Sequence, residues 1–398
     1  MKRVLIVSPV ATHPPHRGNR QRILQVANLF RSSGYHIELA IGRNRPITAE
    51  ARAFWPTINR LKVIPRWKPS HKISQLDSWY TPGLGEEIAD LVATRKIDVV
   101  VLNYVFHSRV LDFLPKSVVT AIDTHDVFTD RHELYLGKRL AGGFFSCSVA
   151  DEKTYVSRAH ATLAITEHER KHFSGIQDPR QVFEIPFAAS AVSLGVRDPN
   201  PADNKKSFGL VLSANDLNLA SLSSFIKAVD FLYGRNPPFA VKVAGGVDKF
   251  AYRYFPHRLP FFCRRWLDYL GEVDDIDTFY QSLDAVVVPV ISGSGMAIKF
   301  AESISRGIPT ISTIAGSRGH ITMNPFHTLP DNSAIAAALG DLGSADLPPL
   351  AAASRQCHDA TQKITQKNWC LFTKFLEDQP SGDRDNRENP HPNSSDRA

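Results

Sequence analysis

The 398-residue sequence has few of the residues that hold small secreted domains or metal centres together. It contains four cysteines, which are scattered and include no Cys-x-x-Cys pair. This spacing indicates neither a disulfide framework nor a zinc site, and it favours buried, reduced thiols. The four positions are Cys147, Cys263, Cys357 and Cys370.

Long apolar runs are also missing. No apolar stretch approaches the ~20 residues of a membrane-spanning helix. The short apolar run after Lys2 and Arg3 lacks the length and the small-residue cleavage site of a signal peptide, so it is predicted to be a first β-strand. We therefore expect a cytoplasmic protein, with peripheral contact at the inner face of the cell membrane as a further option.

Signatures of nucleic-acid and dinucleotide binding are absent too. The formal charge of +7 and the pI near 9.2 admit anionic partners: a sugar nucleotide, anionic lipid headgroups or nucleic acid. No helix-turn-helix, zinc-finger or ribonucleoprotein motif occurs, so nucleic acid is the least supported of the three. Val7-Ser8-Pro9 is not followed by Gly-x-Gly-x-x-Gly, which disfavours a dinucleotide oxidoreductase.

What the sequence does contain is enough apolar material for two cores. At 398 residues with 43% hydrophobic content, the chain exceeds one ordinary domain. Strand-like and helix-like segments alternate through both halves, which predicts an α/β protein with two doubly wound domains. We predict an N-terminal domain at 1–190, a polar linker at 191–207, a C-terminal domain at 208–353, C-terminal helices at 354–376 and a disordered tail at 377–398.

One stretch, residues 284–319, carries the strongest functional pattern. It combines an apolar strand, a Gly-rich turn, a helix predicted at 298–305 and a second strand. A Gly-rich loop that feeds a helix N-terminus can bind an anion, because free backbone N–H groups and the helix dipole point at the ligand. Lys299 and Glu302 share one helix face, so a cation for phosphate and a carboxylate for a sugar diol are predicted together. Many Gly-rich turns of this kind hold no ligand. The ordered combination of glycines, lysine and glutamate is a more specific sign of a ligand site than the glycines alone.

The ordered set Gly-x-Gly-x-x-x-Lys-x-x-Glu, followed by Gly-x-Pro, resembles the donor-binding segment of GT-B glycosyltransferases of family 4. There the segment usually reads Glu-x7-Glu, and its second glutamate holds the nucleotide ribose. Glu302 matches that second position, while Ser294 stands at the first and leaves the donor-sugar contact open. The resemblance implies a GT-B fold: two Rossmann-like domains facing each other across a cleft. It places the donor diphosphate at Gly293, Ser294, Gly295, Met296 and Lys299.

The loop at 11–19 resembles the family's Pro-Pro-x-x-Gly loop, which lies over the donor diphosphate. Gly18 matches the glycine of that loop and is implied as a further diphosphate contact. A surface loop with solvated arginines is the alternative reading. The second domain lacks the arginine and lysine that clasp the diphosphate in the family, so Lys299 or Arg318 is the candidate replacement.

Asp123-Thr124-His125-Asp126 directly follows a β-branched strand at 117–122. Polar groups at the carboxyl end of a parallel strand lie where open α/β sheets bind ligands. The stretch resembles the family's Asp-x-His-Asp segment, which implies that His125 and Asp126 hold the transferred sugar and the attacking hydroxyl. The alternative is that the aspartates cap a helix and the histidine is structural.

Two other regions have mainly structural interpretations. Residues 43–84 carry Trp55, Trp67 and Trp79 among basic residues, and a small core under an insertion is favoured over a glycan or membrane surface. Glu167 and Glu169 follow Thr166, and they are predicted to cap a helix and lie at the surface.

The resemblance implies a retaining, metal-independent glycosyltransferase without a cofactor, in polysaccharide or glycoconjugate biosynthesis. Its partners would be a nucleotide-sugar donor and a glycan or lipid-linked acceptor, not nucleic acid. Two alternatives remain open. One is a sugar-nucleotide epimerase of the same architecture. The other is a degenerate, non-catalytic nucleotide- or glycan-binding scaffold, which Ser294 and the missing Arg/Lys pair favour.

Overall fold

The computed structural model describes residues 1–15, 17–65, 70, 72–133, 145–192, 194, 205–293 and 295–379, without the side chains of residues 258 and 259. The predicted site residue Ser294, Trp67, most of the predicted linker and the tail from residue 380 lie outside these described residues. Within the described ranges, no helix combines the length and apolarity needed to cross a membrane.

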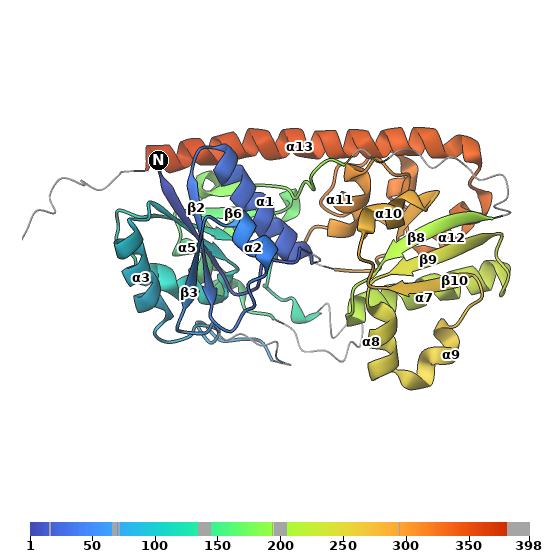
Figure 1. The fold of residues 1–398 in the computed structure, drawn as a ribbon, viewed down its shortest axis with the longest axis horizontal. Coiled ribbons are helices and arrows are strands. Elements are labelled where there is room, and N and C mark those ends of the chain that lie inside the picture. Colours follow the sequence, from blue (N-terminus) through green and yellow to red (C-terminus); the bar gives the residue numbers. More distant parts are fainter. Residues whose placement is uncertain are drawn as a thin grey trace, which may run out of the picture.

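The first sheet has seven parallel strands in the order β3-β2-β1-β4-β5-β6-β7 (Figure 1). Helices cover its faces, which is why its central strands are continuous apolar runs rather than alternating ones. Its strands are β1 (Arg3–Ser8), β2 (His36–Gly42), β3 (Thr57–Leu61), β4 (Val99–Asn103), β5 (Val119–Asp123), β6 (Ala161–Ala164) and β7 (Val182–Glu184). Its helical segments are α1 (Gly18–Ser32), α2 (Ala49–Phe54), α3 (Leu84–Arg95), η1 (Val105–Phe113), α5 (Val149–Ser157), α6 (Glu167–Ile176) and η2 (Pro179–Gln181).

The second sheet has five parallel strands in the order β10-β9-β8-β11-β12. Its first strand begins inside the range predicted for the linker. The strands are β8 (Lys206–Val211), β9 (Phe239–Ala244), β10 (Leu267–Gly271), β11 (Ala285–Val288) and β12 (Thr310–Ser312). The helical segments are α7 (Asp216–Tyr233), α8 (Val247–Tyr254), η3 (Pro256–Arg258), α9 (Leu259–Phe262), α10 (Ile276–Gln281), α11 (Ile298–Ser305), η4 (Pro325–His327), α12 (Asn332–Asp341) and η5 (Ser344–Asp346).

Two parallel sheets confirm the α/β prediction and place a ligand site. In each sheet the strand order reverses once, between β1 and β4 in the first and between β8 and β11 in the second. Ligands of open α/β sheets bind at such reversals, outside the carboxyl ends of the strands.

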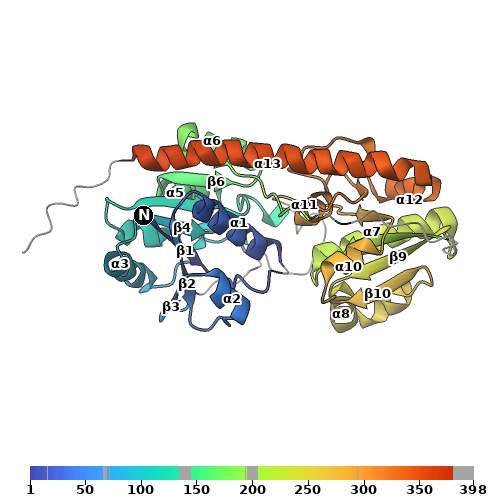
Figure 2. The ribbon, with the colours of Figure 1, turned by 45° about the horizontal axis from the view of Figure 1, so that its top comes forward.

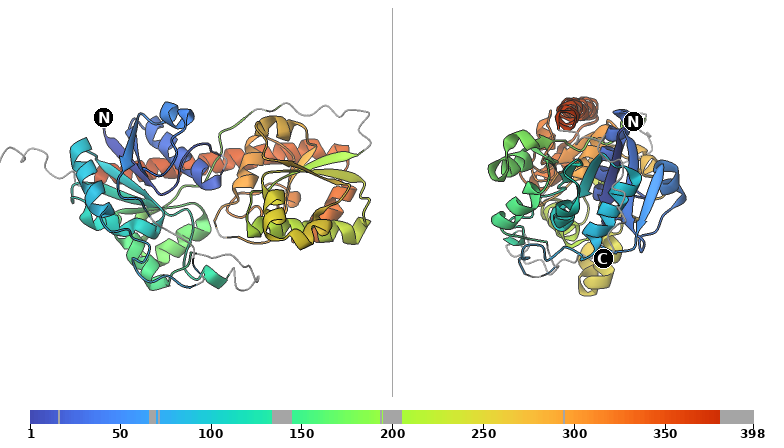
Figure 3. Two further views of the ribbon diagram at one scale, coloured as in Figure 1. Left: turned by 60° about the horizontal axis from the view of Figure 1, so that its bottom comes forward. Right: turned by 90° about the vertical axis from the view of Figure 1, so that its left-hand side faces the viewer.

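One long helix, α13 (Leu347–Asp378), runs along both domains (Figures 1 and 2). In the second domain, Arg355 Nη1 donates to the carbonyl of Gly307 at 3.3 Å. In the first domain, Trp369 Nε1 donates to Ser33 Oγ at 2.9 Å, and its ring meets Phe30 edge-on with centroids 4.8 Å apart. The view in Figure 3 (left) shows the same helix passing behind both domains. No helix end occurs at residue 354, where the sequence analysis began its C-terminal helices.

Two side-chain expectations have different outcomes. Trp55 and Trp79 are 2% and 5% exposed, and Trp55 Nε1 donates to Thr12 Oγ1 at 3.0 Å, so both belong to the core of the first domain. The prediction of buried thiols is wrong for Cys263 and Cys370, which are exposed. Cys263 directly follows the end of α9, and Cys370 lies on the outer face of α13. The spacing of apolar residues does not predict burial at either position.

Candidate active site

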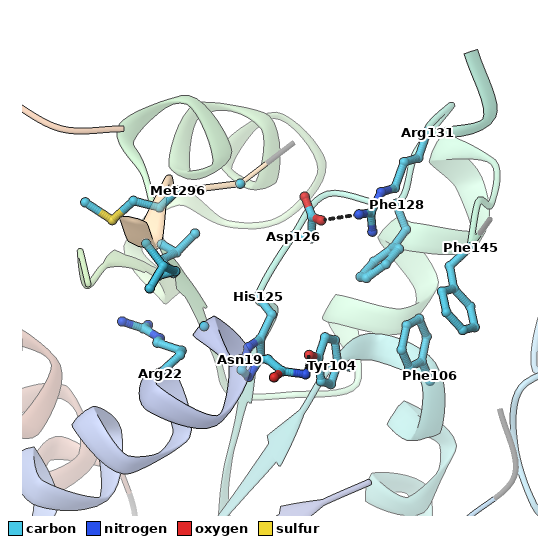
Figure 4. Close-up of a pocket in the computed structure, with 14 residues that line it drawn as sticks. Asn19, Arg22, Tyr104, Phe106, His125, Asp126, Phe128, Arg131, Phe145 and Met296 are labelled. Carbon is cyan, nitrogen blue, oxygen red and sulfur yellow. Dashed lines mark hydrogen bonds and ion pairs between the residues drawn. The ribbon is translucent and has the colours of Figure 1, made fainter. Parts of the chain in front are cut away.

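A cavity of about 280 Å³ lies between the carboxyl ends of the two sheets (Figure 4). Both domains line it. Five of the sequence-predicted site residues meet here: Gly18, His125, Asp126, Gly295 and Met296. Lys299 and Glu302 lie on α11, which begins beside the cavity at Ile298, and they do not line it. Residues far apart in the chain therefore converge on one cleft.

His125 stands in this cavity in a strained backbone conformation. Its φ is +61°, in the left-handed region that non-glycine residues rarely adopt. Tyr104, at the end of β4, has a φ of +66°, and its ring stacks on the imidazole with centroids 4.2 Å apart. Such strain concentrates at ligand sites, where the surrounding structure holds it in place. The two strand ends thus hold the imidazole against Tyr104 within the cavity lining (Figure 4).

The hydrogen bonds of His125 define its protonation. Nε2 lies 2.7 Å from the amide oxygen of Asn103, an acceptor, so Nε2 carries the proton. Burial lowers the pKa of His125 to about 4, against the opposing effect of Asp123, so the ring is neutral near pH 7. Nδ1 makes no hydrogen bond within the described part of the chain, and in this tautomer it is an acceptor. The ring can therefore accept a hydrogen bond from a substrate hydroxyl.

The charged groups of the first domain are paired with one another. Arg22 and Asp123, both 1% exposed at their side chains, form a fully buried ion pair with Nη2 and Oδ1 3.0 Å apart. Arg131 Nη2 lies 2.9 Å from Asp126 Oδ2 (Figure 4). The Arg22–Asp123 pair joins α1 to the end of β5, directly before His125. These two arginines and two aspartates balance one another's charge without a ligand.

Two helix N-termini meet across the cleft. A Cβ added to Gly18 would lie 2.6 Å from Ile298 Cγ1, so only glycine allows α1 and α11 to approach this closely. Neither helix has a side-chain cap, and neither has an acidic residue in its first turn. By contrast, Thr166 caps α6 and Asn215 caps α7. The free N–H groups and dipoles of α1 and α11 therefore favour negative charge at their meeting point.

The loop before α11 has a tightly defined backbone. Gly295 has a φ of +71°, and a Cβ there would lie 3.4 Å from the carbonyl oxygen of His125 in the other domain. The carbonyl of Gly295 accepts a hydrogen bond from Arg318 Nε at 3.0 Å. A Cβ on Gly293 would lie 3.1 Å from Arg318 Nη2, so the guanidinium lies against this loop. On the other side of the loop, Met296 Sδ accepts a hydrogen bond from the backbone N–H of Phe187 at 3.1 Å.

Two partly buried cations flank this loop without a carboxylate in direct contact among the described residues. Lys299 Nζ donates to Asn218 Oδ1, and burial lowers its pKa to about 8. Burial also lowers the pKa of Arg318. Among the described residues, neither cation has a carboxylate oxygen within 4.0 Å. A desolvated cation without a partner is costly, and a bound anion would remove that cost.

Comparison with known proteins agrees with this geometry. Residues 210–344 match the family model described as glycosyl transferases group 1. This match covers most of the second domain, from within β8 to the start of η5. A direct comparison with curated proteins gives no match.

Solved structures extend the likeness to the whole fold. Sucrose-phosphate synthase from Thermosynechococcus elongatus shares 15% identity, covering 95% of this chain and 100% of that chain, with a TM-score of 0.71. HepE from Anabaena, in complex with UDP and glucose, shares 12% identity over 94% and 100% of the two chains, with a TM-score of 0.64. The galactosyltransferase WaaB, of the lipopolysaccharide outer core, shares 13% identity over 95% of this chain and 99% of that chain, with a TM-score of 0.58. The predicted GT-B fold is confirmed.

Glu302 of the second domain is engaged by the first domain. Its Oε1 accepts a hydrogen bond from Gln21 Nε2 of α1 at 2.6 Å. Burial raises the pKa of Glu302, and Gln21, Arg306 and Lys299 oppose that rise. The predicted ribose ligand is therefore in place on α11, but one of its oxygens already has a partner.

Sequence reasoning missed several groups that line or border the cavity. Tyr104 and Arg131 line it, and neither stood in a recognisable motif. Glu169, predicted to lie at the surface, is 2% exposed. Its backbone N–H donates to Thr166 Oγ1 at 3.1 Å, as the capping pattern predicts, whereas its Oε2 accepts from the N–H of Ile165 at 2.9 Å and not from that of Thr166. Burial, together with Asp126, raises the pKa of Glu169 to about 8. The local pattern predicted the cap on the helix but not the burial of the carboxylate.

Proposed function

We propose that this chain transfers a sugar from a nucleotide-sugar donor to a hydroxyl of a glycan or lipid-linked acceptor, with retention, in polysaccharide or glycoconjugate biosynthesis in the cytoplasm. One observation carries the proposal. The uncapped N-termini of α1 and α11 meet at Gly18 and Ile298, beside two partly buried cations with no carboxylate oxygen within 4.0 Å among the described residues. A diphosphate has the charge and size that this arrangement favours.

The donor diphosphate is assigned to the loop at 293–297. Sugar transfer breaks the bond between the anomeric carbon and a phosphate oxygen, and the electron pair stays on the diphosphate. The acceptor oxygen bonds to the anomeric carbon, and its proton passes to the departing phosphate oxygen. Fixed donors aimed at that developing charge lower the barrier, and here they are backbone N–H groups with Lys299 and Arg318. The proposal includes no metal and no cofactor.

The nucleoside is assigned to the same helix. Glu302 lies one turn after Lys299, and its carboxylate can accept hydrogen bonds from the two ribose hydroxyls. HepE, which shares the fold, was solved in complex with UDP and glucose, and this supports a nucleotide sugar as the donor class.

The transferred sugar and the attacking hydroxyl are assigned to the facing domain. His125 presents an unprotonated Nδ1 as an acceptor, and Asp126 lies next to it in the same cavity. Both groups can hold hydroxyls in position, which converts an encounter into a reaction within one complex. Closure of the two domains over this small cavity would also exclude water that would hydrolyse the donor.

A thermal-shift comparison tests the proposal. The protein is melted with UDP-, GDP-, ADP- and dTDP-sugars, and with NAD and NADP, because a ligand of the folded state raises the melting temperature. We expect a shift with one sugar nucleotide. Glu302→Ala should weaken that binding by ~1–3 kcal/mol, the cost of a lost hydrogen bond to a charged group. A shift with NAD alone would overturn the proposal.

Two variants complete the design. Glu86→Ala, an exposed carboxylate on α3 far along the chain from the cleft, is the matched control and should bind like the parent. His125→Ala should lower sugar transfer while nucleotide affinity stays close to that of the parent. Undiminished transfer by His125→Ala would remove the histidine from the site.

A further inference from the structure

The segment 249–267 has a composition unlike the rest of the second domain. It contains five Lys or Arg residues, seven aromatic residues and no Asp or Glu. It comprises most of α8, then η3 and α9, and it ends at the start of β10. Figure 1 shows this yellow segment projecting from the lower side of the domain, away from α13, and the right-hand view of Figure 3 shows it projecting at the bottom as well.

The aromatic residues of this segment divide into two groups. Phe262 and Trp266 are buried and join the core of the second domain. Tyr252 and Tyr254 are 69% and 56% exposed, so their rings are not needed to hold the fold together. The segment is therefore anchored through one set of rings and presents the other set to the outside.

The exposed basic residues lie beside those tyrosines. On α8, Lys249, Tyr252 and Arg253 recur at helical spacing, opposite the buried Ala251. Arg265 is exposed at the end of the segment. Arg264 pairs with Asp230 at 2.7 Å. Lys249, Arg253 and Arg265 have no carboxylate oxygen within 4.0 Å among the described residues. We call Lys249, Tyr252, Arg253, Tyr254 and Arg265 the α8–α9 patch.

We propose that the α8–α9 patch docks the protein on an anionic membrane surface. Exposed tyrosine beside lysine and arginine suits the headgroup region of a bilayer, where the ring is partly buried and the cations meet lipid phosphates. The patch projects rather than forming a hollow, and small-molecule sites are concave. A flat, negatively charged surface is the partner that fits both its shape and its charge.

The position of the patch relates it to the cleft. α8 starts directly after the carboxyl end of β9, through Gly245 and Gly246. β9 and β11 belong to one parallel sheet, so their carboxyl ends lie at the same edge, the edge that carries the loop at 293–297. Docking through α8 and α9 would bring the mouth of the cleft to the membrane. This inference does not rest on the proposed function, because vesicle binding is measured without donor or acceptor.

Vesicle flotation of the full chain tests the proposal. The probes are vesicles of phosphatidylcholine alone and of phosphatidylcholine with phosphatidylglycerol, at low and at raised salt. We expect binding only to the vesicles that contain phosphatidylglycerol, weakened by salt. The triple variant Lys249→Glu, Arg253→Glu, Arg265→Glu should bind them about tenfold or more weakly. All three side chains are exposed, so its melting temperature should match that of the parent.

A second triple variant is the matched control. Lys116→Glu, Lys153→Glu, Lys363→Glu reverses three exposed lysines elsewhere and changes the net charge equally, and it should bind like the parent. Tyr252→Ser with Tyr254→Ser should remove the part of the binding that survives raised salt. Equal loss in both triple variants would show a net-charge effect and overturn the proposal. So would equal binding to neutral vesicles, or binding to polyuridylate RNA with none to vesicles.

Discussion

The two faces of the cleft differ in how their charges are balanced. On the first domain, Arg22 pairs with Asp123 and Arg131 with Asp126. On the second domain, Lys299 and Arg318 are partly buried, and neither has a carboxylate oxygen within 4.0 Å in the described part of the chain. The first face is complete as it stands, and its charges hold the strand ends and His125 in place. A bound anion would give the cations of the second face a counter-charge in direct contact. Stability should therefore depend on the first face and ligand affinity on the second.

The largest effect is expected at the buried pair. Arg22→Met removes the partner of Asp123 and leaves a carboxylate with 1% exposure unpaired, which should cost about 3–5 kcal/mol of unfolding free energy. This loss of unfolding free energy is measured by urea unfolding, monitored by circular dichroism. Adding Asp123→Asn should recover part of the loss, because the unpaired charge is gone. A loss as small as that of Arg180→Met, an exposed arginine, would mean that the first face does not hold the fold.

Arg318→Gln tests the role of the second face in ligand affinity. It should weaken nucleotide-sugar binding by about 1.5–3 kcal/mol, the range for a hydrogen bond between charged groups, with little loss of stability. Titration calorimetry and urea unfolding measure the two quantities. Arg264→Gln is the control, since Arg264 follows α9 and its Nη2 lies 2.7 Å from Asp230 Oδ2, with no hydrogen bond or ion pair to a site residue among those that the structure describes. If Arg318→Gln lowered stability and left affinity unchanged, the contrast between the two faces would be wrong.

The pH dependence of binding follows from Lys299. Its pKa is about 8 in the folded protein, lowered from 10.5 by burial, so its positive charge is lost as the pH rises through 8. Donor affinity should therefore fall by up to about tenfold between pH 7 and 9. The effect on stability has the opposite sign. The unfolded chain binds more protons between the two pKa values, so this lysine makes the fold relatively more stable as the pH rises from 8 to 10.5.

Lys299→Arg is the informative variant for this dependence, because an arginine keeps its charge over the whole range. Calorimetric titrations from pH 7 to 9 should show a flat affinity for the variant where the parent declines. The same decline in both proteins would assign the pH dependence to another group.

Much of the fold was predictable because its signals are local. The helix predicted at 298–305 coincides with α11, since apolar spacing and the Gly-x-Pro stop act within one segment. The position of His125 at a strand end was predictable for the same reason. What sequence did not predict are contacts between distant segments. Tyr104 lines the cavity, and Glu169 is buried, only because the chain folds back, and no spacing within their own segments reports that.

Gln21 and Glu302, 281 residues apart, are the clearest case of such a distant contact and the subject of the smallest predicted effect. Their 2.6 Å hydrogen bond joins the two faces and uses an oxygen that we assign to the ribose. If the ribose must displace the amide, Gln21→Ala should tighten donor binding by about two- to tenfold, the equivalent of one net hydrogen bond. Calorimetry with the preferred sugar nucleotide measures this change. Weaker binding would instead make Gln21 a donor ligand, and the first face would then also take part in binding the nucleotide.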